Sequence, residues 1–130
     1  MDEKLYEHGL NNRKDVLGAE HVERSFANAD EFSQPYQDLV TEYCWGAIWH
    51  RPGLDRKTRS LLNIAMLTAL NREDEFKLHV RAAFRNGVNK EEICEVLLQT
   101  AIYCGIPAAN SAFKQAREVF AAMDKEDAAD

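Results

Sequence analysis

The stretch NREDEFKLHVRAAFRNG, residues 71–87, decides how this 130-residue chain folds. It reads as one amphipathic helix, and the residues that recur at the spacing of a buried stripe are Phe76, Val80, Ala83 and Gly87. Asn86-Gly87 supplies the left-handed residue that closes many helices, and Arg81 and Arg85 lie near the negative end of the helix dipole. We therefore predict a helix with one buried face and a defined C-terminus.

Glu75 and His79 are the candidate chemical residues of this helix. They are four residues apart, so their side chains lie one above the other beside the apolar stripe. Such a pair can act as an acid–base unit in which the carboxylate orients the imidazole. Two other interpretations stay open: an ordinary surface pair, and a metal site for which no third ligand stands out in the sequence.

Helical signals continue through the rest of the chain, and no segment alternates like a strand. Residues 3–17 suggest a peripherally packed helix that stops at Gly18. Ser33 offers an N-cap to a helix that runs to about Trp49. We find no repeat and no linker, so we predict an all-α bundle of about six helices in a single domain over residues 1–130.

Three further signals mark helix ends and burial in the second half. Residues 61–70 are apolar nearly all round, which is typical of a helix buried in a bundle or between subunits. Asn89 and Glu92 have the spacing of a capping box. The tail after Lys125 is polar and acidic, and we expect it to be frayed.

Composition narrows the classes of function. The net charge of −6 argues against a general nucleic-acid binder, but a small anionic substrate needs only a few local arginines. No apolar run approaches the length of a membrane helix, and the start does not resemble a signal peptide. The cysteines Cys44, Cys94 and Cys104 form no CxxC pair, which favours reduced thiols in a cytoplasm.

Arginines and aromatic residues provide candidate binding groups. Arg51 and Arg59 flank a Pro-Gly turn, and Arg59 needs a carboxylate partner, either a substrate or a side chain such as Asp55 or Glu75. Trp45 and Tyr103 are candidates for the wall of a pocket, although large aromatic residues usually indicate packing or a subunit contact.

Several motifs, in order, resemble the γ-carboxymuconolactone decarboxylase family, and the likeness runs from about residue 5 to residue 120. The motifs are Trp49-His50-Arg51-Pro52-Gly53-Leu54, Thr58-Arg59-Ser60-Leu61, Lys77-Leu78-His79-Val80-Arg81-Ala82-Ala83, Asn86-Gly87-Val88 and the run Ala101 to Asn110. The wider superfamily includes alkylhydroperoxidases of the AhpD type, with a shared all-α fold that forms trimers or hexamers. Those enzymes carry a redox CxxC, and here Arg72 and Glu75 stand at the two cysteine positions.

The resemblance implies a carboxy-lyase that needs no cofactor and no metal. Its reaction would be the conversion of γ-carboxymuconolactone to β-ketoadipate enol-lactone in the protocatechuate branch of aromatic catabolism. The implied roles are a carboxylate clamp of Arg59 with Arg51 or Arg81, proton delivery or hydrogen bonding by His79, support of His79 by Glu75, and a pocket shaped by Tyr103 and Trp45.

Two alternatives stay open beside this interpretation. One is a peroxide-handling relative that uses a lone cysteine, and the other is a non-catalytic oligomeric binding module with the same fold. For all three we expect a cytoplasmic homo-oligomer without a nucleic-acid or membrane partner.

Overall fold

The computed structural model describes residues 1–129, and this part of the chain consists of helices joined by turns and loops, with no strand. The predicted all-α class is therefore confirmed. The helices are α1 (Glu3–Leu17), α2 (Ala19–Ala27), α3 (Gln34–Leu39), the π-helix η1 (Val40–Ile48), α4 (Arg56–Leu70), α5 (Glu73–Arg85), α6 (Lys90–Tyr103) and α7 (Ile106–Ala129). None of these helices is long and apolar enough to cross a membrane, among the residues described.

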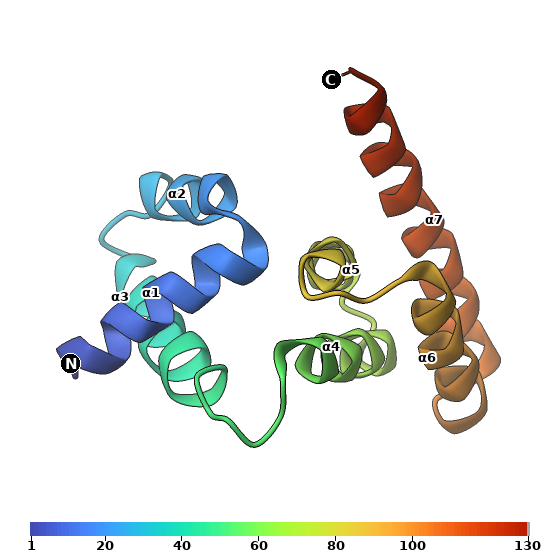
Figure 1. Cartoon of the computed structure of the whole chain (residues 1–130), viewed down its shortest axis with the longest axis horizontal. Helices are drawn as coiled ribbons and strands as arrows, with labels where there is room; N and C mark the ends of the chain where they lie inside the picture. The colour runs from blue at the N-terminus through green and yellow to red at the C-terminus, as the bar shows by residue number, and fades with distance from the viewer. Residues whose placement is uncertain (130) are drawn as a thin grey trace. The chain divides into compact units, whose positions relative to one another are not determined.

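The chain divides into two compact units, Met1–Arg56 and the part from Lys57 onward. The first holds α1, α2, α3 and η1, and the second is built from α4 to α7 (Figure 1). The single domain over residues 1–130 stays a prediction, and the two units are described separately.

In the first unit, α1 packs closely on η1, and two glycines permit the approach. A Cβ added at Gly9 would overlap the carbonyl oxygen of Thr41, and one added at Gly46 would overlap the carbonyl oxygen of Leu5. Val16 at the end of α1 is fully buried. The expectation that the first helix is only peripherally packed is therefore wrong, because the glycines bring two backbones into contact.

The predicted helix from Ser33 to about Trp49 exists, but most of it is wound as a π-helix. The signature of this winding is the bond from the Trp49 N–H to the carbonyl oxygen of Cys44, five residues earlier, at 3.0 Å. Ser33 stands at the predicted cap position without a side-chain cap bond, because its hydroxyl bonds Asp30 instead.

In the second unit, α5 supplies the centre of the hydrophobic core. Phe76, Val80 and Ala83 are at most 1% exposed, and they pack with residues of α4, α6 and α7. In Figure 1, α6 and α7 lie side by side, and α5 also contacts α7. Three members of the predicted stripe are thus confirmed, whereas Gly87 is exposed because it lies beyond the last helical turn.

Both ends of α5 are set by left-handed residues. Gly87 has a φ of +88°, and the Val88 N–H bonds the carbonyl oxygen of Ala83 at 3.0 Å, which is a Schellman closure. Asn71 has a φ of +56° and closes α4 in the same way, since the Arg72 N–H bonds the carbonyl oxygen of Leu67 at 3.1 Å. The helix therefore begins at Glu73 and not at Asn71.

Two other predicted helix signals have clear outcomes. Asn89 and Glu92 form both bonds of the capping box at the start of α6, as predicted. The tail is helical as far as Ala129, so the expected fraying from Lys125 is wrong for the described residues. Asp130 lies outside the described residues.

The second unit carries an apolar face formed by α4, the end of α6 and the start of α7. Its large exposed side chains are Leu62, Met66, Leu70, Leu98, Ile102, Tyr103 and Ile106, each at least 45% exposed. A groove of about 480 Å³ runs between α4 and α6, with Leu61, Ala65 and Val96 in its wall. The inner side of α4 is buried through Ser60, Ile64 and Thr68, so only one side of this helix is covered within the described chain.

Candidate functional site

His79 on α5 is turned toward α4 and is only 8% exposed. Its Nδ1 atom lies 3.5 Å from the Nδ2 atom of Asn63, at the outer limit of a hydrogen bond. A buried imidazole with a polar neighbour on the facing helix can hold a proton at a defined position. His79 is therefore placed between packed core and a polar group, as a general acid or hydrogen-bond donor requires.

Arg59 lies one helical turn before Asn63 on α4, so the two side chains share one side of that helix. The guanidinium is half-buried, and its Nε atom is fully covered. The next residue, Ser60, is buried and accepts a hydrogen bond from Asn86 Nδ2 at 2.8 Å, which ties α4 to the end of α5. Asn63 thus neighbours His79 on the facing helix and Arg59 on its own helix, and we call Arg59, Asn63 and His79 the α4–α5 site.

Glu75 lies outside this site. The residue is exposed in the first turn of α5, whereas the hydrogen-bonding neighbour that the structure gives His79 is Asn63. The spacing of four residues displaces Glu75 from His79 by about 40° around the helix, which is enough to separate a buried from an exposed position. A supporting role of Glu75 stays a prediction.

Arg81 is held by α7. Its Nη1 atom lies 2.7 Å from Oε2 of Glu126, and one turn earlier Lys77 reaches Glu118 on the same helix at 2.7 Å. These pairs lower the pKa of both carboxyl groups, mainly through the hydrogen bond from the cation. Arg81 is thus part of the α5–α7 contact, and its role as a substrate clamp stays a prediction.

The remaining predicted residues lie in different surroundings. Trp45 in η1 is 3% exposed and stacks on Trp49, with ring centroids 4.8 Å apart. Arg51 is exposed in the segment that follows η1. Tyr103, at the end of α6, is 80% exposed and belongs to the apolar face. Cys44 and Cys104 are exposed, and Cys94 is half-buried.

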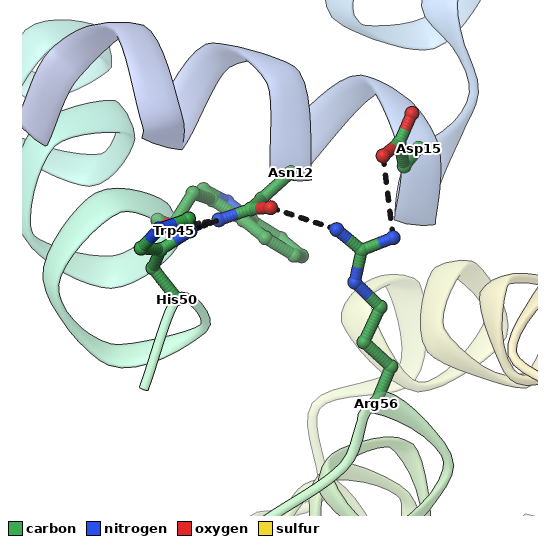
Figure 2. Close-up of polar contacts among 5 residues, drawn as sticks. All are labelled: Asn12, Asp15, Trp45, His50 and Arg56. Carbon is green, nitrogen blue, oxygen red and sulfur yellow. Dashed lines mark hydrogen bonds and ion pairs between the residues drawn. The ribbon is translucent and has the colours of Figure 1, made fainter. Parts of the chain in front are cut away.

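The first unit contains a polar cluster that the sequence did not reveal. Asn12 on α1 is 5% exposed and contacts three groups, the carbonyl oxygen of Trp45 at 2.9 Å, Nδ1 of His50 at 3.2 Å and the guanidinium of Arg56 at 2.7 Å. Arg56 also reaches Asp15 at 3.2 Å, as Figure 2 shows. Trp45, His50 and Arg56 are 33 to 44 positions from Asn12, so no local pattern could have linked them to it.

Metal-ligand chemistry was one interpretation of the helix 71–87. Among residues 1–129, no group of three or more His, Cys, Asp or Glu side chains is placed to hold a metal ion. The polar groups that the structure brings together in the α4–α5 site are instead an imidazole, an amide and a guanidinium.

The structure defines a small all-helical protein with a buried imidazole at the contact of two helices. The family model described as the carboxymuconolactone decarboxylase family matches residues 34–118 of this sequence. The chain belongs to the carboxymuconolactone decarboxylase family, so the resemblance seen in the sequence is confirmed.

Three relatives illustrate the range of this similarity. A 4-carboxymuconolactone decarboxylase of Acinetobacter baylyi is 50% identical over 119 residues, which are 92% of this chain and 89% of that protein. A nitrosuccinic acid decarboxylase of Metarhizium robertsii is 46% identical over 108 residues, 83% of this chain and 76% of that protein. An uncharacterized 15.0 kDa protein of Paracoccus denitrificans is 37% identical over 89 residues, 67% of this chain and 66% of that protein.

Two of these relatives bear the name of a decarboxylase. The predicted enzyme class, a carboxy-lyase, is therefore confirmed.

Asn63 is the residue of the α4–α5 site that was not predicted from the sequence to have a chemical role. The signal was present, because Asn63 was a polar exception in an otherwise apolar helix, four residues after Arg59.

Proposed function

We propose that this chain decarboxylates 4-carboxymuconolactone to β-ketoadipate enol-lactone, as a step in protocatechuate catabolism. The observation that carries the proposal is the 50% identity to a protein named for that activity, over 92% of this chain. The α4–α5 site supports it, because a buried imidazole there neighbours Asn63, and the cation Arg59 lies one helical turn before Asn63.

The chemistry of the substrate requires little from the protein. When the ring carboxylate leaves as CO2, the electron pair of the broken C–C bond moves through the ring double bond to the lactone carbonyl. A proton added to the ring carbon next to that carbonyl then gives the enol-lactone. The substrate is its own electron sink, so the reaction needs an anion clamp, a donor to the lactone oxygen and a proton.

The residues of the site match these three tasks. Arg59 binds a substrate carboxylate through its planar guanidinium. His79 donates to the forming dienolate or delivers the proton, and Asn63 holds the imidazole ring. Arg51 and Arg81 are the candidates for the second carboxylate, Glu75 supports His79, and Trp45 and Tyr103 shape the pocket.

Nitrosuccinic acid is a second candidate substrate, because a relative named for its decarboxylation is 46% identical over 83% of this chain. Nitrosuccinic acid is also a dicarboxylate in which an electron-withdrawing group can accept the electron pair left by CO2. The two candidates therefore require the same clamp and the same proton donor, and they differ in the shape of the electron sink.

We also propose that the protein works in the cytoplasm as a homo-oligomer, a trimer or hexamer, without a nucleic-acid or membrane partner. Support for assembly comes from the apolar face, whose side chains would stay in water in a single copy. Tyr103 lies on that face, so it can shape a pocket only where a second copy covers it.

The deciding experiment is turnover of the purified protein. We expect loss of the ultraviolet absorbance of 4-carboxymuconolactone with release of CO2 in a ratio of one to one. The same protein is assayed with nitrosuccinate and, for the thiol alternative, with a peroxide and thiol titration. Faster turnover of nitrosuccinate would move the assignment to the second candidate, and peroxide-linked loss of thiols without CO2 would overturn both.

A further inference from the structure

A pocket of about 270 Å³ lies between α6 and α7 in the second unit, where the two helices run side by side (Figure 1). Its floor is apolar, because Ile93, Leu97 and Ala116 are at most 2% exposed and belong to the hydrophobic core. The pocket lies on the α7 side of α6, whereas the groove of the apolar face runs between α4 and α6. It shares no lining residue with that groove or with the α4–α5 site, so it is a separate feature of this unit.

Aromatic rings form part of the wall of this α6–α7 pocket. Phe113 and Phe120 of α7 are half-buried, and the Phe120 ring is held by Phe84 of α5, which meets it edge-on with centroids 5.8 Å apart. Rings in this position can contact a planar apolar group by its face or its edge. The volume is below the range of about 300–1,000 Å³ that is typical of sites for drug-sized ligands, so the pocket suits a small ligand with one ring.

The charged side chains that line the pocket are both cations, Lys90 at the start of α6 and Arg117 on α7. The Nζ atom of Lys90 lies 5.0 Å from the centroid of the Phe120 ring. Both cations are exposed, and within residues 1–129 neither makes an ion pair with a carboxylate. Glu118, which follows Arg117, pairs instead with Lys77 of α5 at 2.7 Å. Two cations beside an apolar floor favour an anion with an apolar body.

We propose that the α6–α7 pocket binds a small aromatic carboxylate, with the ring against Phe113 and Phe120 and the carboxylate at Arg117 and Lys90. An aliphatic carboxylate would meet the cations but would cover the aromatic wall less well. An uncharged aromatic molecule would fill the wall and leave the cations in water. This inference goes beyond the proposed function and does not depend on it, because no residue of the pocket has a role in that reaction.

Cys94 provides the first test, because it is half-buried and lines the pocket. The full-length protein is alkylated with iodoacetamide, and mass spectrometry follows each thiol separately. The probe is benzoate, with an expected Kd on the order of 1 mM for a ligand of about nine non-hydrogen atoms. At about ten times that concentration, alkylation of Cys94 should slow about tenfold. Cys44 and Cys104 are exposed and lie outside the lining, so their rates should not change. An unchanged rate at Cys94 would overturn the proposal.

Three further probes test the chemical class of the ligand. Hexanoate has the charge without the ring, benzyl alcohol has the ring without the charge, and sulfate has charge alone. Each lacks one of the two features, so each should need a several-fold higher concentration than benzoate for the same protection of Cys94. Equal protection by hexanoate would overturn the aromatic part of the proposal. Equal protection by benzyl alcohol or by sulfate would overturn the joint role of ring and charge.

Arg117→Gln and Lys90→Gln test the two cations. Each variant loses one charge, so each should raise the Kd of benzoate about tenfold. Lys114→Gln removes an exposed cation of α7 that does not line the pocket, and it is the matched control. Phe113→Leu keeps an apolar wall without a ring, so it should reduce the preference for benzoate over hexanoate. Wild-type affinity in both cation variants would overturn the proposal.

Turnover separates this site from the proposed reaction. Arg117→Gln should lose benzoate affinity and keep the wild-type rate with 4-carboxymuconolactone, because the pocket shares no residue with the α4–α5 site. Benzoate that bound only at the α4–α5 site would leave Cys94 unprotected and would keep its affinity in Arg117→Gln, which would contradict the inference. Protection of Cys94 in a protein that does not turn over 4-carboxymuconolactone would contradict the proposed function and support the pocket.

Discussion

His79 and Arg59 differ in the tasks that their positions allow. His79 is almost fully covered and lies beside Asn63 on the facing helix, so it can place a proton with little competition from water. Arg59 is half-buried and one turn from Asn63, so its charge can meet an anion at the edge of the packed region. Chemistry and binding should therefore separate in variants of these two residues.

His79→Gln tests the chemical role. Glutamine keeps a polar side chain of similar length but cannot act as an acid at neutral pH, so we expect kcat to fall by about a hundredfold or more. Circular dichroism and the thermal midpoint should change little. His21→Gln is the control and should keep wild-type kcat. An unchanged kcat in His79→Gln would remove His79 from the mechanism.

Arg59→Lys tests the binding role. The charge remains but the planar fork is lost, so we expect KM to rise by about tenfold with a smaller change in kcat. Arg24→Lys, an exposed arginine on α2, is the matched control and should leave KM unchanged. If KM does not change in Arg59→Lys, Arg59 has a structural role only.

At the level of single residues, the sequence predicted that His79 is a candidate, and the structure adds a neighbour that the sequence did not indicate. Asn63 on another helix lies beside His79, and Glu75 on the same helix is exposed, while the roles of His79, Arg59 and Glu75 stay predictions. Spacing along one helix describes a single surface, whereas the partner of a buried group is decided by which helix packs on that surface. The same reason explains why the Asn12–His50 contact was missed.

Helix ends and helix crossings follow different rules. The capping box at Asn89 and the left-handed Gly87 were both predicted, because each depends on residues within one turn. The α1–η1 crossing depends on Gly9 and Gly46, which are far apart along the chain. The π-helical winding was also not predicted, since it differs from an α-helix by one residue in each hydrogen-bonded ring.

Gly9→Ala tests the crossing. The new methyl group would overlap backbone of η1, which cannot move as a side chain can, so we expect a loss of about 1–3 kcal/mol or more in the free energy of unfolding. Gly53→Ala is the control, because nothing lies within 4 Å of its new Cβ, and it should change stability by less than about 0.5 kcal/mol. Equal stabilities in urea unfolding would contradict this packing.

The ion pairs between helices should make the second unit sensitive to acid. Hydrogen bonds from Lys57, Lys77 and Arg81 lower the pKa of Glu92, Glu118 and Glu126 from the ordinary value of 4.5. Between the unfolded and folded pKa values, the unfolded chain binds more protons. The free energy of unfolding that these ion pairs contribute is therefore fully present above the unfolded pKa. It is lost as the pH falls through the folded pKa.

Urea unfolding at pH 7 and at pH 4 measures this contribution. The triple variant Glu92→Gln, Glu118→Gln and Glu126→Gln keeps side-chain length but cannot be protonated, so its stability should fall less between the two pH values. Because the three carboxylates are on the surface, high salt should reduce the difference. An equal loss of stability in the triple variant and in the wild-type protein would show that these pairs do not contribute.

For the whole molecule, the apolar face predicts assembly. Light scattering should give the mass of a trimer or hexamer, and Met66→Glu, which places a charge at a 52% exposed position of that face, should shift the protein toward smaller species. Asn11→Glu puts the same charge on the exposed side of α1 and should leave the mass unchanged. A wild-type monomer would contradict assembly through this face.

The fold class and the family could be predicted from the sequence alone, because both depend on local periodicity and on motifs in order. The composition of residues 61–70, apolar nearly all round, indicated burial in a bundle or between subunits. Within the described chain, one side of α4 is covered and the other is not. A sequence cannot say which of its apolar sides a second copy will cover, since that depends on the shape of the folded surface.

The π-helical segment Val40–Ile48 has a consequence for changes in chain length. Each of its rings contains one residue more than a ring of an α-helix, so excising one residue could restore ordinary α-helical bonding. Every side chain after the excision would then swing by about 100° around the axis. A one-residue deletion here would thus give a more regular helix in which Trp49 and His50 no longer point toward their present neighbours. Helix content would be kept while side-chain orientation is lost.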